Sequence, residues 1–402
     1  MENRIVIISE MFYPSTTTTA HILTDVADGL ARRFDVEVIT TSSLYDIREE
    51  EFREETSEEK TYPIHRIKGK GYDKNHILSR IFGLFSTSFK LGWKIVRNVR
   101  KTDRVLIVTN PAPLLLLVSL LRKFKPFNLT VLVHDVFPEN TLAAGLIKSE
   151  SNIFYRVSRK IFNKAYLSAD NLVVLGRDMA DVVAKKVGHG KNAPTITIIE
   201  NWADSIPDSE FRESAQGDND SLRVLYAGNI GRVQGLEYFI DIICEADNPA
   251  LSFTIRGDGA KAREIRTRVE SLPRSGIEFA DKFTRKEQLE ILLNCDIALV
   301  ILTKGMYGLG VPSKSYNIME AGKPILFIGD LNSEIARMVR ENDIGYCFDI
   351  EDRQGIKEWL SGLGAHSKQE FRLKGERARK LSKTTYSKEC GIEKFNRLFS
   401  GK

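Results

Sequence analysis

The chain has 402 residues, 42% of them hydrophobic and 28% charged, and its formal net charge is +5. This composition is that of a folded globular protein, and the length favours two domains over a single core. The four cysteines lie far apart and form no CxxC pair, which argues against a structural zinc site and fits a reducing compartment. The longest apolar run, residues 112–121, is well under the roughly 20 residues that a spanning helix needs. We therefore expect a protein that is neither secreted nor membrane-spanning.

Short apolar runs alternate with amphipathic stretches in the first half of the chain. Between the first two runs, residues 20–33 carry apolar side chains at helical spacing. Near-continuous apolar strands joined by helices are typical of a parallel sheet that is covered on both faces. The strands predicted in this half are residues 4–8, 36–40, 105–108, 129–133, 171–175 and 195–199.

The same pattern starts again after residues 201–221, which are rich in Asp, Ser, Asn and Gly and are typical of a linker. We predict an α/β protein with two Rossmann-like doubly wound domains, residues 1–204 and 205–383. A last helix within residues 384–402 has no strand after it and is predicted to cross back to the first domain. The strands predicted in the second half are residues 222–226, 252–255, 277–279, 297–301, 324–327 and 345–348.

A glycine-rich loop follows the first strand of the second half. Ligands of open parallel sheets bind beyond the carboxyl ends of the strands, so such loops are the place to look for a site. The loop reads Ala-Gly-Asn-Ile-Gly-Arg-Val-Gln-Gly at 227–235 and leads into a helix. Glycines let backbone N–H groups approach an anion, and Arg232 adds a charge. The alternative is a tight turn that needs glycine for its geometry, and the spacing is not the dinucleotide fingerprint GxGxxG.

A second polar segment follows the strand at 297–301 and reads Val-Pro-Ser-Lys-Ser-Tyr-Asn-Ile-Met-Glu at 311–320. Pro312 suits the first turn of a helix, where Ser313 and Lys314 present a hydroxyl and a cation. Such a set suits a diphosphate.

Further along this predicted helix, Asn317 and Glu320 are three residues apart and so share a helical face. A carboxylate in that place is suited to accept hydrogen bonds from ribose hydroxyls. The alternative is that Glu320 caps the next turn while Lys314 is solvated. The convergence of Ser, Lys, Asn and Glu at one strand end favours a ligand site.

These two segments resemble the donor-binding segments of family 4 glycosyltransferases, in the subgroup that builds O-antigen, capsule and other bacterial surface polysaccharides. Further matching motifs are His-Asp-Val-Phe-Pro-Glu at 134–139, Val-Val-Leu-Gly at 173–176, Ile-Glu-Asn-Trp-Ala-Asp at 199–204 and Gly-Asp-Gly at 257–259, so the resemblance runs through nearly the whole chain. It implies the GT-B fold, with two Rossmann-like domains facing across a cleft, and a retaining mechanism without a bound metal or cofactor. The donor-binding residues that it implies are Gly228, Asn229, Arg232, Gln234, Arg256, Ser313, Lys314, Tyr316, Asn317 and Glu320.

Two positions depart from the family pattern. Family members often carry two glutamates eight residues apart on the donor helix, whereas here Glu320 holds the second position and Pro312 the first. Many members also have a lysine where Gln234 stands. The role of the first glutamate therefore falls to other groups or is absent, and Arg232 and Lys314 are expected to neutralise the phosphates. The string Asp-Asn-Asp at 218–220 looks like a metal-binding DxD, but it lies in the polar linker and reads as a solvated turn.

The acceptor is expected at the first domain. The loop after the first strand carries Thr16, Thr17 and Thr18 where family members usually have a glycine pair. Their hydroxyls suit hydrogen bonds to a sugar, and equally suit a cap on the following helix.

Three titratable residues follow the strand at 129–133 and are the candidate catalytic groups, namely His134, Asp135 and Glu139. A retaining transfer needs the leaving diphosphate stabilised and the incoming hydroxyl deprotonated, by a side chain or by the leaving group itself. A histidine after a strand is also a common structural hydrogen bonder.

Residues 76–104 carry many lysines and arginines against one acid, Asp103, with Phe and Trp interleaved at helical spacing. This pattern favours a helix that lies in an anionic lipid interface. The alternative is an ordinary amphipathic helix packed on the sheet. We see no DNA or RNA module, so nucleic acid is not an expected partner. The acidic run at 49–59 reads as a surface loop.

The sequence thus predicts a retaining hexosyltransferase of family 4 type. Its expected donor is a UDP-sugar, with N-acetyl-fucosamine or a related aminosugar as the candidate on subgroup resemblance. Its expected acceptor is linked to polyprenyl diphosphate, at the inner face of the bacterial inner membrane, in O-antigen, lipopolysaccharide or capsule biosynthesis. Two alternatives stay open: a UDP-sugar epimerase or hydrolase of the same architecture, and a non-catalytic partner subunit that binds a nucleotide sugar.

Overall fold

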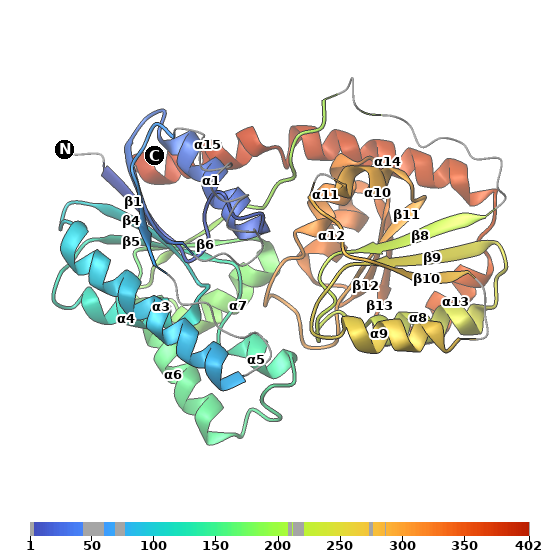
Figure 1. The fold of residues 1–402 in the computed structure, drawn as a ribbon, viewed down its shortest axis with the longest axis horizontal. Coiled ribbons are helices and arrows are strands. Elements are labelled where there is room, and N and C mark those ends of the chain that lie inside the picture. Colours follow the sequence, from blue (N-terminus) through green and yellow to red (C-terminus); the bar gives the residue numbers. More distant parts are fainter. Residues whose placement is uncertain are drawn as a thin grey trace.

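The computed structural model forms two parallel sheets, each covered by helices on both faces (Figure 1). The prediction of two Rossmann-like α/β domains is confirmed. The acidic run at 49–59 and the Asp-Asn-Asp string at 218–220 lie outside the described residues. The structure describes residues 4–42, 60–68, 77–207, 211, 221–272, 276–285 and 287–401, with side chains from residue 82 onward in the helix that starts at 77.

The first sheet has the strand order β3-β2-β1-β4-β5-β6-β7, and all its pairings are parallel. Its central strands are almost wholly buried because Ile and Val fill both faces. The edge strand β3 was not predicted, since only two of its four residues are apolar. The strands are β1 (Arg4–Ile8), β2 (Asp35–Thr41), β3 (Ile64–Ile67), β4 (Arg104–Val108), β5 (Asn128–Val133), β6 (Asn171–Val174) and β7 (Thr195–Ile198).

The helices of this domain follow the strands as predicted from the helical spacing. The first of them begins after Thr17, whose hydroxyl accepts the Ala20 N–H. The helices are α1 (Thr18–Leu30), α3 (Ile77–Asn98), α4 (Ala112–Leu121), α5 (Glu139–Ala143), α6 (Ile153–Leu167) and α7 (Arg177–Val187).

The second sheet has the order β10-β9-β8-β11-β12-β13, again all parallel. Its strands are β8 (Leu222–Ala227), β9 (Leu251–Arg256), β10 (Ile277–Ala280), β11 (Ile297–Ile301), β12 (Ile325–Gly329) and β13 (Gly345–Asp349). Its helices, together with the last two of the chain, are α8 (Leu236–Ala246), α9 (Ala262–Glu270), α10 (Gln288–Leu293), α11 (Lys314–Glu320), α12 (Glu334–Asn342), α13 (Arg353–Ser361), α14 (Ser367–Thr384) and α15 (Lys388–Ser400).

Each sheet has a point at which the strand order reverses. In the first sheet the chain runs outward from β1 to β2 on one side and returns to β4 on the other. In the second sheet β8 lies in the same way between β9 and β11. Ligands of open α/β sheets bind at such points, beyond the carboxyl ends of the strands. The loops after β1, β4 and β5 and those after β8, β9 and β11 are therefore the candidate site.

The end of the chain returns to the first domain, where α15 packs against α1 (Figure 1). A methyl group on Gly29 of α1 would stand 2.3 Å from the side chain of Ile392, so the glycine allows the close approach. Lys388 forms an ion pair with Asp25, whose carboxylate also accepts the Trp202 indole N–H at 2.9 Å. Within the described part of the chain, no helix is both long enough and apolar enough to cross a membrane.

Candidate active site

At one end of the second sheet, the loop after β8 is joined by backbone hydrogen bonds to the end of β9 and to the loop after β11. The Gly228 N–H donates to the Arg256 carbonyl at 3.0 Å, and the Thr303 N–H donates to the Val233 carbonyl at 2.9 Å. A methyl group on Gly257 would stand 1.9 Å from the Gly228 carbonyl oxygen, so only glycine fits there. The predicted glycine-rich loop therefore forms one surface with its neighbours on both sides.

Lys314 lies under this surface. Its Nζ is 3.6 Å from the centroid of the Tyr226 ring and 3.0 Å from where a Cβ on Gly228 would stand. Among the described residues this Nζ has no hydrogen-bond partner, and burial lowers the pKa of Lys314 to about 7. Burying an ammonium group without a hydrogen-bond partner costs free energy, unless a bound ligand supplies the missing acceptor. The charge and position of this lysine suit an anion seated beside Gly228.

Two further polar groups on these loops are buried with no partner in the described chain, namely Arg256 Nε at the end of β9 and Thr303 Oγ1 after β11. Asn229 and Arg232 are exposed on the loop after β8. Unsatisfied buried donors gathered at strand ends are typical of a site that binds a polar ligand.

Two other predicted donor residues, Gln234 and Asn317, bond to neighbouring protein groups, and a third, Ser313, is left available. Gln234 Oε1 accepts the Gly231 N–H at 2.9 Å, so this side chain shapes the glycine-rich loop. Asn317 donates to Gln288 at 3.3 Å. Ser313 is half-buried and makes no capping bond to α11, so its hydroxyl is not used by that helix.

Two predicted donor residues are buried and have partners within the protein. Tyr316 is wholly buried and packs edge-on against Tyr386, with ring centroids 5.6 Å apart, so its ring belongs to the core. Glu320 is 4% exposed, and its two oxygens accept the Ile206 N–H at 2.9 Å and the Ser382 hydroxyl at 2.8 Å. Glu320 therefore links the interdomain linker to α14, and its contact with a ribose stays a prediction.

In the first domain, His134 and Asp135 are held by the loop after the neighbouring strand. Their backbone N–H groups donate to Thr109 Oγ1 at 3.1 and 3.3 Å, and His134 Nδ1 lies 3.2 Å from Thr19 Oγ1. Burial lowers the pKa of His134 to about 4 and raises that of Asp135 to about 6. Near neutral pH the imidazole is therefore uncharged and the carboxyl is mostly ionised.

Glu139 does not join this pair. Lys186 of α7 donates to both of its carboxylate oxygens at 2.6 Å, and Arg159 of α6 lies 3.8 Å away. The Lys186 side chain is almost fully buried. The charge of Glu139 thus ties α5 to α7, and a catalytic role for this residue stays a prediction.

The threonines of the loop after β1 have different roles. Thr17 caps α1, which is one of the two alternatives for this loop. Thr16 and Thr18 are exposed, and their contact with an acceptor stays a prediction. The neighbouring Thr19 was not predicted as a site residue, although its hydroxyl meets His134.

A second residue that the sequence did not single out is Glu10, directly after β1 at the reversal of the strand order. It is 4% exposed, and burial raises its pKa to about 7. The position of this acid after the first strand could have marked it as a candidate site residue. Only the fold, however, shows that its side chain is buried.

The two halves of the site touch through the loop at 303–310. The Val136 N–H donates to the Leu309 carbonyl at 3.0 Å. A Cβ on Gly310 would stand 3.6 Å from Asp135 Oδ1. Lys314 follows four residues later along the chain, so one short segment connects the contact with the candidate catalytic carboxyl to the buried cation.

No protein-family model matches the chain. Two curated relatives do. One is a probable glycosyltransferase, WbjE, of Pseudomonas aeruginosa, 35% identical over 333 residues that cover 80% of each chain. The other is a putative colanic acid biosynthesis glycosyl transferase, WcaI, of Escherichia coli K12, 23% identical over 201 residues, or 47% of this chain and 48% of that one.

Solved structures of the same fold cover nearly the whole chain. A sucrose-phosphate synthase of Thermosynechococcus elongatus has a TM-score of 0.73 at 14% identity and covers 99% of this chain and 98% of its own. HepE of Anabaena, solved in complex with UDP, has a TM-score of 0.70 at 14% identity, covering 99% and 100%. WaaG, a glycosyltransferase of lipopolysaccharide biosynthesis, has a TM-score of 0.66 at 14% identity, covering 99% and 100%.

The fold, the loops at the two reversals of strand order and the likeness to WbjE over four-fifths of both chains lead to one conclusion. The chain belongs to the glycosyltransferases of GT-B fold.

Proposed function

We propose that the protein transfers a sugar from a UDP-sugar, with retention of configuration, to an acceptor on polyprenyl diphosphate. The reaction would take place at the inner face of the bacterial inner membrane, in the assembly of a surface polysaccharide. Within that proposal, N-acetyl-fucosamine or a related aminosugar is the candidate donor sugar, family 4 is the candidate family, and no metal or cofactor is required.

The observation that carries the donor proposal is the buried Lys314 ammonium beside Gly228, which has no hydrogen-bond partner in the part of the chain that the structure describes. A nucleoside diphosphate would supply the missing anion, and Arg256 Nε would add a second donor. Support also comes from HepE, a neighbour in fold that was solved with UDP. The names of WbjE, WcaI and WaaG agree with a transferase of surface polysaccharides.

The proposed chemistry needs few groups. The bond between the anomeric carbon and the diphosphate oxygen breaks, and a bond to the acceptor oxygen forms on the same face of the sugar. Lys314 stabilises the charge that develops on the leaving diphosphate. The hydroxyl proton passes to the Asp135 carboxylate or to the departing phosphate, and the uncharged His134 orients the acceptor by hydrogen bonding.

The membrane part of the proposal rests on the exposed face of α3. Its apolar side chains Phe82, Phe85, Phe89 and Trp93 are all more than half exposed, while Leu91 and Ile95 on the other face are fully buried. Exposed aromatic residues of this size are unusual on a surface that meets only water. Basic residues of the same helix suit contact with anionic lipid.

Helix α6 extends this face, which the sequence did not indicate. α4 packs against both α3 and α6, so the three helices lie together on one side of the first domain (Figure 1). On α6 the apolar side chains Ile153, Phe154, Val157 and Ile161 are exposed, and exposed basic residues alternate with them, namely Arg156, Arg159, Lys160 and Lys164.

The test of the donor site is thermal stability of the whole chain against a panel of nucleotides and nucleotide sugars. A ligand at a hundredfold excess over its Kd stabilises the folded state by about 2.7 kcal/mol. A clear shift with UDP, larger with one UDP-sugar, is expected and names the sugar for transfer assays. Release of free sugar or an epimer without a glycoside would support the epimerase or hydrolase alternative. No shift with any nucleotide would contradict the proposal.

A further inference from the structure

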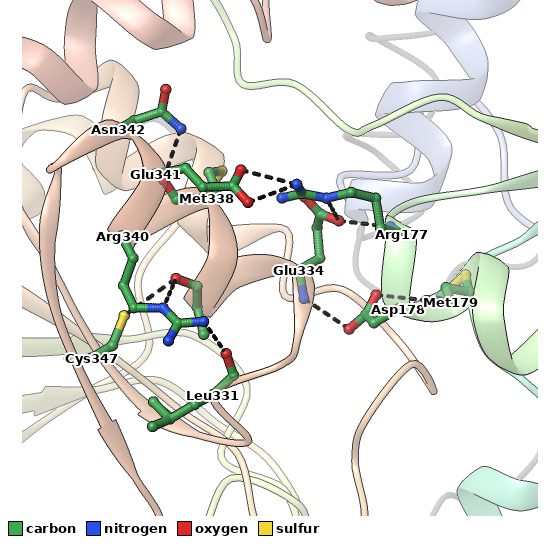
Figure 2. Close-up of polar contacts among 11 residues, drawn as sticks. Arg177, Asp178, Met179, Leu331, Glu334, Met338, Arg340, Glu341, Asn342 and Cys347 are labelled. Carbon is green, nitrogen blue, oxygen red and sulfur yellow. Dashed lines mark hydrogen bonds and ion pairs between the residues drawn. The ribbon is translucent and has the colours of Figure 1, made fainter.

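Two helices from different domains cap each other. The first N–H of α12, on Glu334, donates to Asp178 Oδ2 at 2.9 Å. The first N–H of α7, on Arg177, donates to Glu334 Oε2 at 2.6 Å. Figure 2 shows the Asp178 carboxylate pointing toward the Glu334 backbone nitrogen and the Glu334 side chain pointing toward Arg177. Since the first N–H groups of a helix have no partner within it, each helix depends on the other domain for one of them.

Neither helix supplies this cap itself. Gly176 precedes α7 and has no side chain to offer. Ser333 precedes α12 but makes no capping bond, and its Oγ is buried without a partner in the described chain. A methyl group on Gly176 would stand 2.7 Å from Glu334 Cβ, so the glycine is what lets the two helices meet.

The contact is buried and charged. Asp178 is 2% exposed and Glu334 is 5% exposed. The Arg177 guanidinium binds the carboxylate of Glu334 and, at 2.8 and 2.9 Å, the two oxygens of Glu341 (Figure 2). Separating the domains here would exchange these charge-assisted hydrogen bonds for bonds to water, and hydrogen bonds to charged groups contribute more to stability than those between neutral groups.

Asp178 also packs against the loop that leads to the donor helix. A Cβ on Gly308 would stand 2.5 Å from the Asp178 backbone carbonyl oxygen. Burial raises the pKa of the Asp178 carboxyl, and the nearby backbone N–H groups of Glu334, Met179 and Gly308 oppose that rise. Next to that glycine, the Tyr307 hydroxyl donates to Asp181 at 2.9 Å. With the backbone bond at Leu309, the loop is hydrogen-bonded to the first domain at residues 307 and 309 and packs closely against it at Gly308.

We infer that Asp178 is a positioning residue, which holds the loop at 303–310 against the first domain and so sets Asp135 opposite a donor bound at Lys314. The kinetic part of this inference rests on the proposed function. Gly310, at the end of the loop, lies beside Asp135, and the donor cation follows four residues later. Transfer requires the reacting groups to be aligned closely, and a misplacement of about 1 Å can cost on the order of a hundredfold in rate.

The test compares Asp178→Ala with Asp352→Ala. Asp352 is a matched control because its side chain caps α13 within one domain, accepting the Gly355 N–H at 3.0 Å. Three quantities are measured on each whole chain: the Kd for UDP, kcat for transfer, and the radius of gyration from small-angle X-ray scattering. For Asp178→Ala we expect an unchanged Kd, a kcat lowered by roughly tenfold to a hundredfold, and a larger radius of gyration. For Asp352→Ala we expect wild-type kcat and radius.

Equal effects of the two variants, or an unchanged kcat and radius in Asp178→Ala, would overturn the inference. If Asp178→Ala does not fold, Tyr307→Phe is the variant that tests the inference. It removes only one bond of the same loop, the hydrogen bond from the Tyr307 hydroxyl to Asp181. We expect it to lower kcat at constant Kd, and a wild-type kcat would overturn the inference. Failure of the wild-type chain to bind UDP would instead contradict the proposed function, while the scattering still reports whether Asp178 holds the domains together.

Discussion

The two halves of the candidate site differ in the charge type of their buried side chains. At the strand ends of the second domain, the charged side-chain atoms that are buried without a hydrogen-bond partner in the described chain are Lys314 Nζ and Arg256 Nε. The buried titratable groups of the first domain are instead an imidazole and two acids, His134, Asp135 and Glu10. Burial favours the uncharged form of Lys314 and of these three groups.

The consequence of that burial differs between the halves. An anionic ligand restores the charge of a buried lysine, so burial on the second domain favours binding. A carboxyl whose pKa lies near the working pH exchanges protons readily, so burial on the first domain favours catalysis. Changes to the second domain should therefore alter affinity, and changes to the first should alter rate.

The largest effect is expected for Lys314→Met. It should weaken UDP binding by about a hundredfold, because hydrogen bonds from a charged group contribute about 1.5–3 kcal/mol each. Isothermal titration calorimetry near neutral pH measures the Kd. Lys304→Met is the control, since Lys304 lies in the preceding loop, is largely exposed and pairs with Glu351. An unchanged Kd in Lys314→Met would contradict the charge assignment of this half.

Asp135→Asn should lower kcat by about a hundredfold, because general-base catalysis typically contributes a rate factor of about that size. The Kd for UDP should stay unchanged. The active form is the carboxylate, so wild-type kcat/KM should fall as the pH drops through about 6, and the variant should lack this decline. Steady-state kinetics across a pH series test both points.

The contrasting variant in the same domain is Glu139→Gln. It should keep its kcat but melt at a lower temperature, since the buried Lys186 loses its charged partner. A large loss of kcat without a change of Tm would instead return Glu139 to the catalytic groups.

The affinity for UDP should depend on pH through Lys314. Its pKa of about 7 in the free protein should rise when the anion binds, so binding takes up protons. The affinity contributed by this charge is fully present below about pH 7 and is lost by about tenfold per pH unit above it. Lys314→Arg should bind with little pH dependence above neutrality, because arginine stays charged. A wild-type affinity that is flat from neutral to alkaline pH would exclude this linkage.

The smallest effect is expected on the surface that we propose contacts lipid. Phe154→Ser on α6 should weaken binding to vesicles that contain anionic lipid by about tenfold, since burying a phenyl group contributes about 1.5–3 kcal/mol. Leu373→Ser on α14 removes an exposed apolar side chain from the other domain and should have no effect. Co-sedimentation with vesicles measures both, and equal binding of the two variants would remove α6 from the proposed surface.

The sequence predicted the strands well because runs of Ile and Val that fill both faces of a parallel sheet leave a continuous apolar signal. It also placed the two loops of the donor half, since glycine, lysine and serine after a strand need no distant partner to be recognised. The edge strand β3 carried no such signal, because its Ile-His-Arg-Ile residues pair on one side only.

Two of the predicted site residues have partners within the protein that the sequence did not indicate, because these partners lie far away along the chain. Glu139 is paired with a lysine 47 residues later, and Glu320 accepts a hydrogen bond from a backbone group 114 residues earlier. Helical spacing put Glu320 on the same face as Asn317, but it does not show what packs against that face. Only the fold reveals that the linker and α14 occupy it.

The return of α15 to α1 means that the first domain is assembled from two separate pieces of chain. A gene fragment that stops at the linker would lack Ile392, which fills the space over Gly29, and Lys388, which pairs with Asp25. Such a fragment would expose apolar surface on α1 and should be poorly soluble. A chimaera that exchanges the first domain between relatives must therefore carry the last helix together with the N-terminal half, even though the whole second domain separates them in the gene.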